Sequence, residues 1–280
     1  MFGPYLYAVF GSPIVHSKSP DIHRAFATQC EQDVIYTKQE VRPDEFETVC
    51  KEFFALGGSG LNITLPLKEL AFQFADKLTA RAQLAGAVNT LALTKDGSVL
   101  GDNTDGAGLV WDMCDNLGWS LNGKNILILG AGGAVRGVLG PLLEKKPASI
   151  LIANRTPERA YELAAVFATI GNVQGTSYDN LPKYAFDIVI NGTSMSLSGA
   201  IPPITSAQIN KQTHAYDMAY GNRPTPFLQW LNERGLVHLS DGLGMLVEQA
   251  AESFKLWRGV MPNTHPVINQ LRDEMLAVEE

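Results

Sequence analysis

Cysteine and histidine are scarce in this sequence of 280 residues, and neither is spaced as metal ligands usually are. Cys30, Cys50 and Cys114 lie far apart, are odd in number and form no CxxC pair. The five histidines are scattered, with no HExxH or HxH pair. We therefore expect no metal site, and we expect structural thiols in a reducing, cytoplasmic environment.

Positive charge is also scarce, because 22 Lys and Arg residues stand against 29 Asp and Glu residues, for a net charge of -7. Surfaces for nucleic acid or anionic membranes normally carry clustered basic residues, so neither partner is expected. The longest apolar stretch, NILILGAGGAV, ends at Arg136 and is well short of the roughly 20 residues that cross a bilayer. The N-terminal MFGPYLYAVF lacks the basic and long apolar regions of a signal peptide.

What is present is an alternation of short apolar runs with amphipathic segments, in a chain that is 45% hydrophobic and 18% charged. That composition is typical of a core-forming protein, and the length suffices for two domains. From residue 5 to 105 the runs YAVF, VIYTKQEV and LNIT alternate with PDIHRAFATQC, PDEFETVCKEFFALG and KELAFQFADKL. This rhythm predicts a mostly parallel sheet covered by helices. AVNTLAL and SVLGDN, joined by Lys95-Asp96-Gly97, predict a hairpin at its end.

A second alternation begins at NILIL and continues through SILIA, DIVI, HAYDMAY and LVHL, with VRGVLGPLLEK, PERAYELAAVFAT and FLQWLNERG between them. It predicts a second α/β domain. Two amphipathic helices are expected after Asp241, in MLVEQAAESFKLWRG and PVINQLRDEMLAVE. We therefore predict an α/β fold of two domains, with residues 1–105 plus 241–280 in one and residues 106–240 in the other.

A glycine-rich turn opens the second alternation, where Gly130-Ala131-Gly132-Gly133-Ala134 follows NILIL and begins a helix. This is the context that a dinucleotide-binding turn requires. Glycines let the chain turn sharply and let a pyrophosphate approach backbone N–H groups at the helix N-terminus. The pattern departs from strict GxGxxG because Val135 stands in place of the third glycine, and a plain strand-to-helix turn is the alternative.

The end of the next strand indicates which dinucleotide would bind. NAD-binding units usually place Asp or Glu there for the ribose 2′-hydroxyl, but here Asn154 and Arg155 follow SILIA. Thr156 can cap the following helix with Pro157 first, which puts Arg159 in the first turn, where the helix dipole disfavours a cation. A bound 2′-phosphate would offset that cost. The arginines therefore predict NADP rather than NAD, the alternative being solvated surface charge.

Two hydroxyl residues follow the first strand, in Ser17-Lys18-Ser19-Pro20. Ser19 suits a helix N-cap, with Pro20 at the first helical position. Capping does not require Ser17, and two hydroxyls at a helix N-terminus would also suit a substrate carboxylate. Capping and anion binding both remain open for this segment.

Lys68 is predicted in the first turn of a helix, after LNIT and Pro66. The helix dipole there disfavours the charged form of a lysine, which is a poor structural choice and a useful catalytic one. The alternative is an exposed lysine whose charge is screened by water.

The loop GDNTDG at residues 101–106 also allows several interpretations, since its aspartates suit a turn, a calcium loop or a catalytic carboxylate. The three-residue spacing of Asp102 and Asp105 disfavours calcium, because an EF-hand places its acids at alternate positions and ends in a distant Glu. A turn and a catalytic carboxylate both remain open for this loop.

The motifs FGSPIVHSKSP, NITLPLKE, AGAVNT, GDNTDG, GAGGAVRG, NRT, DMAYG and DGLGMLVEQA occur in the order and approximate spacing of shikimate dehydrogenases. Over nearly its whole length the sequence resembles that family. The resemblance implies a cytoplasmic enzyme that reversibly reduces 3-dehydroshikimate to shikimate with NADPH, on the route to chorismate and the aromatic amino acids. It implies a substrate-binding domain and a Rossmann-type NADP-binding domain with the site in the cleft between them, in a monomer or a homodimer.

The resemblance also implies residue roles. Lys68 and Asp105 would form the catalytic pair, and both would hold substrate oxygens, which leaves Asp102 to shape or cap the turn. From the chemistry of the reaction we expect Lys68 to be the acid/base and Asp105 its orienting partner. Further substrate-binding residues would be Ser17 and Ser19 for the carboxylate, aided by Tyr220, and Thr64, Asn89 and Gln249 for the ring hydroxyls.

For the cofactor, the resemblance implies pyrophosphate binding at Gly130, Ala131, Gly132, Gly133 and Ala134, 2′-phosphate binding at Asn154, Arg155, Thr156 and Arg159, and nicotinamide contacts at Thr193, Met218 and Gly242. Thr193 and Met218 have plainer interpretations, as part of a turn and as core packing.

The chemistry is coherent with these residues, because a hydride delivered to a ketone leaves an oxygen that needs a proton and a nearby cation. Two alternatives are a quinate/shikimate dehydrogenase with relaxed cofactor use and a non-catalytic NADP- or metabolite-sensing module. Arg155 and Arg159 disfavour NAD, while only the pocket shape decides whether quinate is accepted. The presence of both Lys68 and Asp105 disfavours the sensing module.

Overall fold

The structure is a computed structural model that describes residues 4–277, apart from the side chain of Leu197. The chain divides into two compact units. Unit 1 comprises Met1–Gly108 and Val247–Val267, and unit 2 comprises Leu109–Leu246 and Ile268–Glu280. Helices α5 (Asp105–Trp111), α9 (Leu243–Arg258) and α10 (His265–Ala277) each contain residues of both units.

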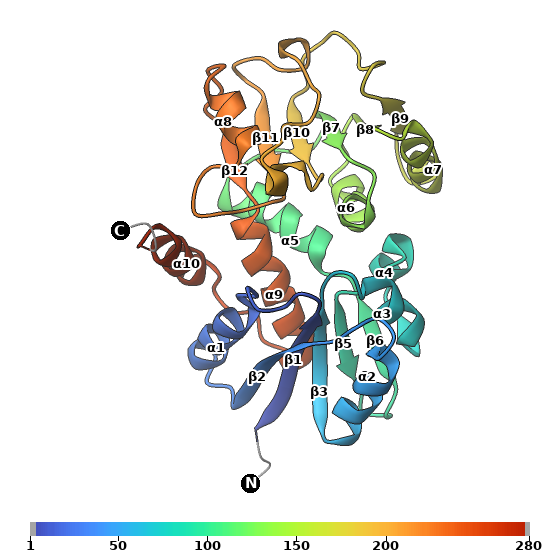
Figure 1. The fold of residues 1–280 in the computed structure, drawn as a ribbon, viewed down its shortest axis with the longest axis vertical. Helices are drawn as coiled ribbons and strands as arrows, with labels where there is room; N and C mark the ends of the chain where they lie inside the picture. Colours follow the sequence, from blue (N-terminus) through green and yellow to red (C-terminus); the bar gives the residue numbers. More distant parts are fainter. Residues whose placement is uncertain (1–3, 278–280) are drawn as a thin grey trace. The chain divides into compact units, whose positions relative to one another are not determined.

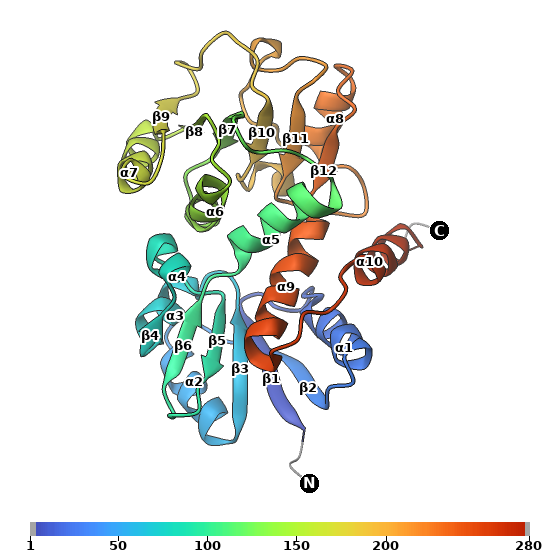
Figure 2. The ribbon, with the colours of Figure 1, turned by 180° about the vertical axis from the view of Figure 1, so that it is seen from behind.

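The other elements of unit 1 are, in chain order, β1 (Tyr5–Gly11), α1 (Ser19–Gln29), β2 (Val34–Glu40), α2 (Phe46–Ala55), β3 (Gly58–Ile63), α3 (Lys68–Phe74), β4 (Lys77–Leu78), α4 (Ala80–Ala85), β5 (Thr90–Leu93) and β6 (Val99–Asp102). The strands form one sheet in the order β2-β1-β3-β5-β6-β4 (Figures 1 and 2). β1 pairs in parallel with β2 and β3, while β5 runs antiparallel to β3 and β6. The predicted hairpin is therefore confirmed, with Gly97 at a φ of +82° in its turn.

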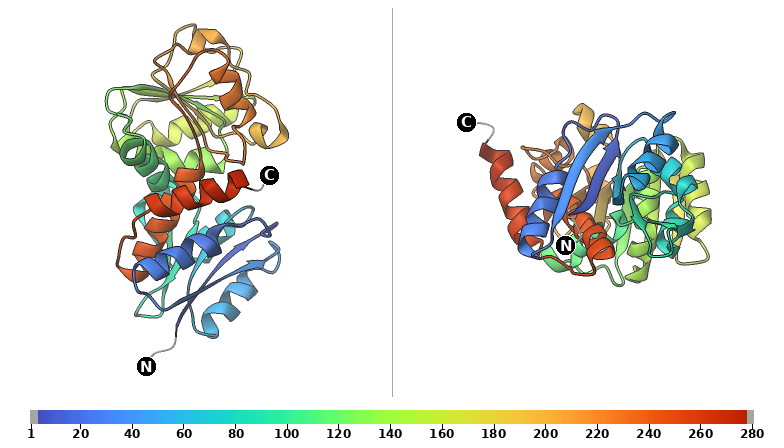
Figure 3. Two further views of the ribbon diagram at one scale, coloured as in Figure 1. Left: turned by 90° about the vertical axis from the view of Figure 1, so that its left-hand side faces the viewer. Right: turned by 90° about the horizontal axis from the view of Figure 1, so that it is seen from below.

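Successive side chains of a strand point to opposite faces of a sheet, and helices cover both faces of this one. Phe10 of β1 faces α2 and α3, in a buried cluster that includes Phe46 and Leu67. On the other face Tyr7 stacks on Trp257 of α9, with ring centroids 4.4 Å apart. Figure 3 (left) shows α1 and α2 on opposite sides of the sheet.

His23 of α1 lies on the same face of the sheet as Trp257 and is 1% exposed. Its ring stacks on Tyr36 of β2, with centroids 4.3 Å apart and planes 6° apart. Within the described residues neither ring nitrogen has a hydrogen-bond partner. Burial disfavours the charged ring and lowers the pKa of His23 to about 3.

This buried imidazole predicts acid-sensitive stability. Between pH 7 and pH 5 the unfolded chain gains a proton at a histidine of ordinary pKa, about 6.5, while the folded chain does not. Stability is therefore full above pH 6.5 and falls as the pH drops toward 3, with a loss of about 2 kcal/mol in the free energy of unfolding at pH 5. Urea unfolding at both pH values should show this loss for the wild type and for the exposed control His16→Phe, and less of it for His23→Phe. Equal losses in all three proteins would contradict the assignment.

The elements within unit 2 are, in chain order, β7 (Asn125–Leu129), α6 (Gly133–Glu144), β8 (Ser149–Asn154), α7 (Pro157–Phe167), β9 (Val173–Ser177), β10 (Ile188–Asn191), β11 (His214–Asp217), α8 (Pro226–Asn232) and β12 (Leu239–Asp241), with a π-helical turn at Asp112–Asn116 and 3-10 turns at Met195–Ser198 and Ser206–Gln208. The sheet order is β12-β11-β10-β7-β8-β9, and the paired strands are parallel (Figure 1). Read from β9 this is the 3-2-1-4-5-6 order of a Rossmann fold. The predicted parallel α/β fold is confirmed.

Two strands of unit 2 differ from the sequence expectation. β9 was not predicted, since its sequence VQGTS has little apolar character and includes a glycine. The last strand was expected at 236–239 but is β12, because Leu236 instead packs into the core beside Phe227 and Leu231 of α8. At sheet edges, packing outweighs the local pattern.

The C-terminal residues from Ile268 group with unit 2, whereas the sequence division places them with residues 1–105. Arg272 of α10 explains this grouping. Its guanidinium lies 2.5 Å from the Asp241 carboxylate at the end of β12 and donates to the carbonyl oxygen of Gly221 at 3.4 Å.

Candidate functional site

Lys68 and Asp105 form an ion pair in unit 1, with Lys68 Nζ 2.5 Å from Asp105 Oδ2. Lys68 is the first residue of α3, as predicted, and Asp105 is the first residue of α5. The two side chains are 24% and 12% exposed, so the pair is shielded but still reaches solvent. This arrangement excludes the fully exposed lysine that the sequence left open.

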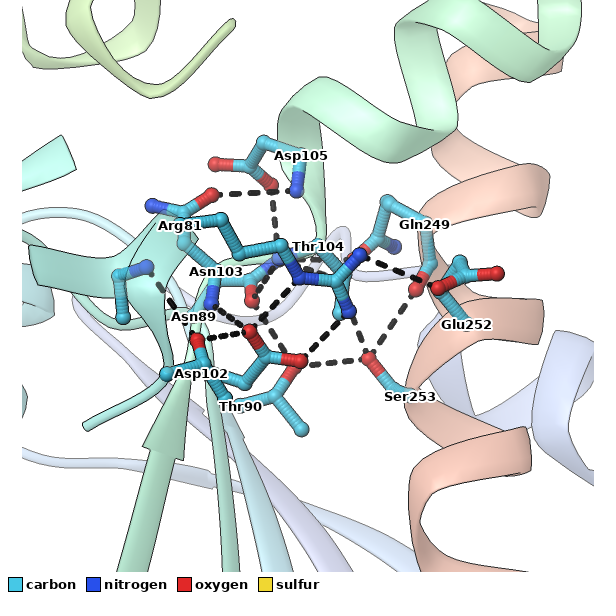
Figure 4. A network of polar contacts seen from close by, with 12 residues as sticks. Arg81, Asn89, Thr90, Asp102, Asn103, Thr104, Asp105, Gln249, Glu252 and Ser253 are labelled. Carbon is cyan, nitrogen blue, oxygen red and sulfur yellow. Dashed lines mark hydrogen bonds and ion pairs between the residues drawn. The ribbon is translucent and has the colours of Figure 1, made fainter. Parts of the chain in front are cut away.

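Asn89 holds the second oxygen of Asp105, donating from Nδ2 to Oδ1 at 2.8 Å. The same amide lies 3.2 Å from Gln249 Oε1 of α9, and its own oxygen accepts from the Thr104 backbone N–H at 2.9 Å. Figure 4 shows Asn89 just before β5, Thr104 and Asp105 at the start of α5, and Gln249 of α9 close together. The structure therefore brings four predicted substrate residues into one polar cluster: Lys68, Asn89, Asp105 and Gln249.

Ser17 and Ser19 lie in the segment that leads into α1. Ser19 is the first helical residue and Lys18 the N-cap, without a side-chain cap, so the predicted capping role of Ser19 is wrong by one position. Instead the Ser17 hydroxyl accepts a hydrogen bond from the Ser19 backbone N–H at 3.3 Å. The Ser19 side chain instead forms a hydrogen bond with Tyr36. Burial raises the pKa of Tyr36, and this hydrogen bond opposes the rise.

Thr64 follows β3, and its methyl group packs against Gly11 at the end of β1. This contact leaves no room for a side chain at position 11. Asn62, two residues earlier in β3, was not predicted from the sequence as a site residue. It is 7% exposed, accepts from the Tyr36 hydroxyl at 2.7 Å and donates to Ser253 Oγ at 3.1 Å. A polar residue between two buried apolar ones in the strand LNIT was the available signal.

In unit 2, the glycine-rich turn links β7 to α6, as predicted. Gly130 has a φ of +102°, a conformation that side-chain-bearing residues rarely adopt, and Gly132 is the N-cap of α6. Ideal Cβ atoms at Gly132 and Gly133 would meet nothing within 4 Å, so open space lies beside the helix N-terminus. Among the neighbouring alanines, Ala131 is half-buried and Ala134 exposed.

Three further cofactor candidates lie at the carboxyl ends of β10, β11 and β12. A Cβ atom on Gly130 would lie 3.1 Å from the Thr193 methyl group. A Cβ atom on Gly242 would lie 2.3 Å from the Met218 carbonyl oxygen, which leaves no room for a side chain there. Asn191 accepts from the Thr193 backbone N–H at 3.0 Å, which confirms the turn at 191–193. Ligands of open α/β sheets bind at this edge, where the strand order reverses between β7 and β10.

The end of β8 carries the arginines predicted for a 2′-phosphate. Asn154 ends the strand and donates to the Thr156 carbonyl at 2.9 Å, and Thr156 is the N-cap of α7. Arg155 and Arg159 are exposed, and no carboxylate in the described part of the chain pairs with either. Arg155 lies near Tyr178, whose pKa burial raises to about 12 while the guanidinium opposes the rise.

Tyr220 also belongs to unit 2, and its pKa is raised by burial and by the Asp241 carboxylate. The cofactor candidates of this unit fit NADP: a glycine turn with open space at a helix N-terminus, and two exposed guanidinium groups after the neighbouring strand.

Family models match most of the chain. The model of the shikimate dehydrogenase substrate binding domain matches residues 9–91, that of shikimate / quinate 5-dehydrogenase residues 113–214, and that of the shikimate 5′-dehydrogenase C-terminal domain residues 242–272. A relative from Cellvibrio japonicus named shikimate dehydrogenase (NADP(+)) is 57% identical over 270 residues, which cover 96% of this chain and 98% of that protein. The chain belongs to the shikimate dehydrogenase family. The resemblance predicted from its motifs is confirmed.

Solved structures also match nearly the whole chain. The Ael1 enzyme from Pseudomonas putida is 45% identical with a TM-score of 0.91, covering 95% of this chain and 98% of that one. Shikimate dehydrogenase from Thermus thermophilus, in complex with NADP(H) and shikimate, is 31% identical with a TM-score of 0.83, covering 96% and 99%.

Between residues 4 and 277 no helix is long and apolar enough to cross a membrane. In that same range no group of three or more His, Cys, Asp or Glu side chains could hold a metal ion.

Proposed function

We propose that this chain catalyses the reversible, NADPH-dependent reduction of 3-dehydroshikimate to shikimate, with Lys68 as the acid/base and Asp105 as its orienting partner. The observation that carries the proposal is the shielded Lys68–Asp105 ion pair, held by Asn89. Family membership and the NADP-dependent relatives support the reaction and its place in the route to chorismate.

When bound, NADPH supplies a hydride to the ketone carbon. The Lys68 ammonium donates a proton to the ketone oxygen, and the neutral amine takes a proton from the hydroxyl in the reverse direction. Asp105 keeps the ammonium in place through Oδ2 while Asn89 occupies Oδ1, so the carboxylate cannot rotate freely. Because Lys68 is 24% exposed, it can be reprotonated from solvent after each turnover.

Unit 1 would bind the substrate. Ser17 and Ser19 would hold the carboxylate at the start of α1, with Tyr220 of unit 2 as a further donor. Thr64, Asn89 and Gln249 would bond the ring hydroxyls, since each offers a polar side chain at the edge where Lys68 and Asp105 stand.

Unit 2 would bind the cofactor. The turn from Gly130 to Ala134 would take the pyrophosphate at the N-terminus of α6, and Asn154, Arg155, Thr156 and Arg159 would take the 2′-phosphate end. Thr193, Met218 and Gly242 would lie along the nicotinamide, which the position of all three after the ends of β10, β11 and β12 supports. The free thiols of Cys30, Cys50 and Cys114 support a reducing, cytoplasmic location. The enzyme would act as a monomer or a homodimer.

The experiment that tests this function follows NADPH absorbance with 3-dehydroshikimate, and NADP or NAD reduction with shikimate or quinate in the reverse direction. We expect turnover of 3-dehydroshikimate and shikimate, with NADP preferred to NAD. Absence of turnover on shikimate by folded protein would overturn the proposal, and equal turnover of quinate would broaden it.

Gly132→Ala tests the cofactor turn. The added methyl group meets no protein atom within 4 Å, so the free energy of unfolding should change by about 1 kcal/mol or less. The methyl group would occupy the space that a pyrophosphate needs, so the Kd for NADPH should rise about tenfold or more. Calorimetric titration of NADPH measures this, and an unchanged Kd would place the pyrophosphate elsewhere.

A further inference from the structure

Arg81 of α4 joins two acidic side chains that come from different parts of unit 1. Its guanidinium binds Asp102 through two atoms, with Nε 2.7 Å from Oδ1 and Nη2 2.5 Å from Oδ2. Its third nitrogen, Nη1, lies 3.2 Å from Glu252 Oε2 of α9. Figure 4 shows the guanidinium between the two carboxylates, directly beside the substrate residues.

Both carboxylates are shielded from water, and Arg81 pairs with each of them. Asp102 is 2% exposed and Glu252 is 12% exposed. Burial alone would raise the pKa of Asp102, but Arg81 and Thr79 hold it below its usual range. Without Arg81, two like charges would remain with little solvent, so one of them would have to take up a proton or move.

Asp102 anchors the loop that presents Asp105. Its carboxylate accepts from the Asn103 backbone N–H at 2.8 Å, and its carbonyl accepts from the Asn89 backbone N–H at 3.0 Å. Asn103 Oδ1 in turn accepts from the Asp105 backbone N–H at 3.2 Å. A shift of Asp102 would therefore be passed on to Asn89 and to Asp105.

Glu252 anchors the helix that presents Gln249. The two residues are three apart on α9, so their side chains leave the same face of the helix. Gln249 is held to Asn89 at 3.2 Å and to Thr104 Oγ1 at 3.5 Å, both neutral and long contacts. Ser253 of the same helix adds neutral contacts to Thr90 Oγ1 at 2.7 Å and to Thr104 Oγ1 at 3.3 Å. The Arg81–Glu252 ion pair adds a charged contact to these neutral ones, and charge-assisted contacts are the stronger kind.

We propose that Arg81 is a positioning residue that sets the distance between the Asp105 loop (residues 103–105) and α9, and thereby aligns Asp105, Asn89 and Gln249 for substrate. It acts through Asp102 and Glu252 and does not itself touch substrate. The proposal rests on the proposed function, since it assumes that these three residues bind substrate.

The test compares Arg81→Met, Arg81→Lys and the charge-free triple variant Arg81→Met/Asp102→Asn/Glu252→Gln with the wild type. The matched control is Arg42→Met, because Arg42 also binds an aspartate, Asp44, through two atoms in unit 1, but both side chains are largely exposed. The readouts are kcat and KM for shikimate, the Kd values for shikimate and NADP by calorimetry, the pH profile of kcat/KM, and thermal unfolding.

For Arg81→Met we expect kcat/KM to fall about 10- to 100-fold, with a raised KM and a weaker Kd for shikimate, because misplaced groups lose alignment. The Kd for NADP should stay within about twofold, since the cofactor candidates belong to unit 2. The acid limb of the pH profile should move to higher pH, because Asp102 becomes a titrating group. Arg81→Lys should recover only part of the loss, since an ammonium cannot bind both Asp102 oxygens and Glu252 in one plane.

A purely structural role would lower the amount of active enzyme and leave KM and the Kd for shikimate unchanged, which would overturn the proposal. If Arg81→Met does not fold, the Lys variant and the triple variant decide, and wild-type kcat/KM in either folded variant would overturn it. If none of the three folds, Arg81 is a folding residue and the proposal fails. An inactive wild type would instead overturn the proposed function, while the Kd for shikimate would still report on Arg81.

Discussion

Lys68→Ala is expected to lower kcat by about 10²- to 10⁴-fold, the range that a general acid/base contributes. The ammonium that pairs with Asp105 at 2.5 Å is then absent, so no proton is delivered to the substrate oxygen. NADPH affinity should be retained, because the glycine-rich turn belongs to unit 2. Steady-state kinetics with 3-dehydroshikimate and calorimetric titration of NADPH measure the two effects separately.

The matched control is Lys51→Ala. Lys51 also pairs with a carboxylate, Glu47 at 2.6 Å in α2, but both side chains are largely exposed. Its kcat should equal that of the wild type. A double variant, Lys68→Ala/Asp105→Asn, should be little worse than Lys68→Ala, because residues that act as a unit have non-additive effects. Near wild-type turnover in Lys68→Ala would remove Lys68 from the mechanism.

Arg155→Ala/Arg159→Ala is expected to reduce the preference for NADP over NAD by about 100-fold. Hydrogen bonds from a cation to a phosphate contribute about 1.5–3 kcal/mol each, and solvent screening at these exposed sites lowers that figure. The Kd for NAD should stay within about twofold, because NAD has no 2′-phosphate for the arginines to bind. Titrations of both dinucleotides at two salt concentrations test this, and the loss for NADP should shrink at high salt.

Arg234→Ala is the control for this pair, since Arg234 is an arginine of the same unit that stacks on Trp230 at 4.0 Å. It should leave both Kd values unchanged. Equal weakening of NADP and NAD by the double variant would show that the arginines support the local fold and do not read the 2′-phosphate.

Local sequence signals predicted the features that depend on neighbours along the chain. Asp96-Gly97 between alternating runs predicted the hairpin of β5 and β6, and Pro66 before Lys68 predicted a helix with the lysine in its first turn. The apolar run NILIL predicted a strand, and in the structure that strand, β7, is buried on both faces, as a parallel sheet requires. Predictions failed where the structure depends on residues that are distant in the sequence. β9 was not predicted, and the N-cap of α1 is Lys18, one position before the predicted Ser19.

The two aspartates of GDNTDG show the difference most clearly. From the sequence we expected Asp105 to act in catalysis and Asp102 to shape or cap the turn, and the sequence also predicted the α/β class, the glycine turn and the family. Only the tertiary structure revealed that Asp102 pairs with Arg81, 21 residues earlier, and that Arg81 also reaches Glu252, 171 residues later. Ion pairs and buried polar networks depend on which side chains the fold brings together and on how far it excludes water, and local sequence patterns carry neither.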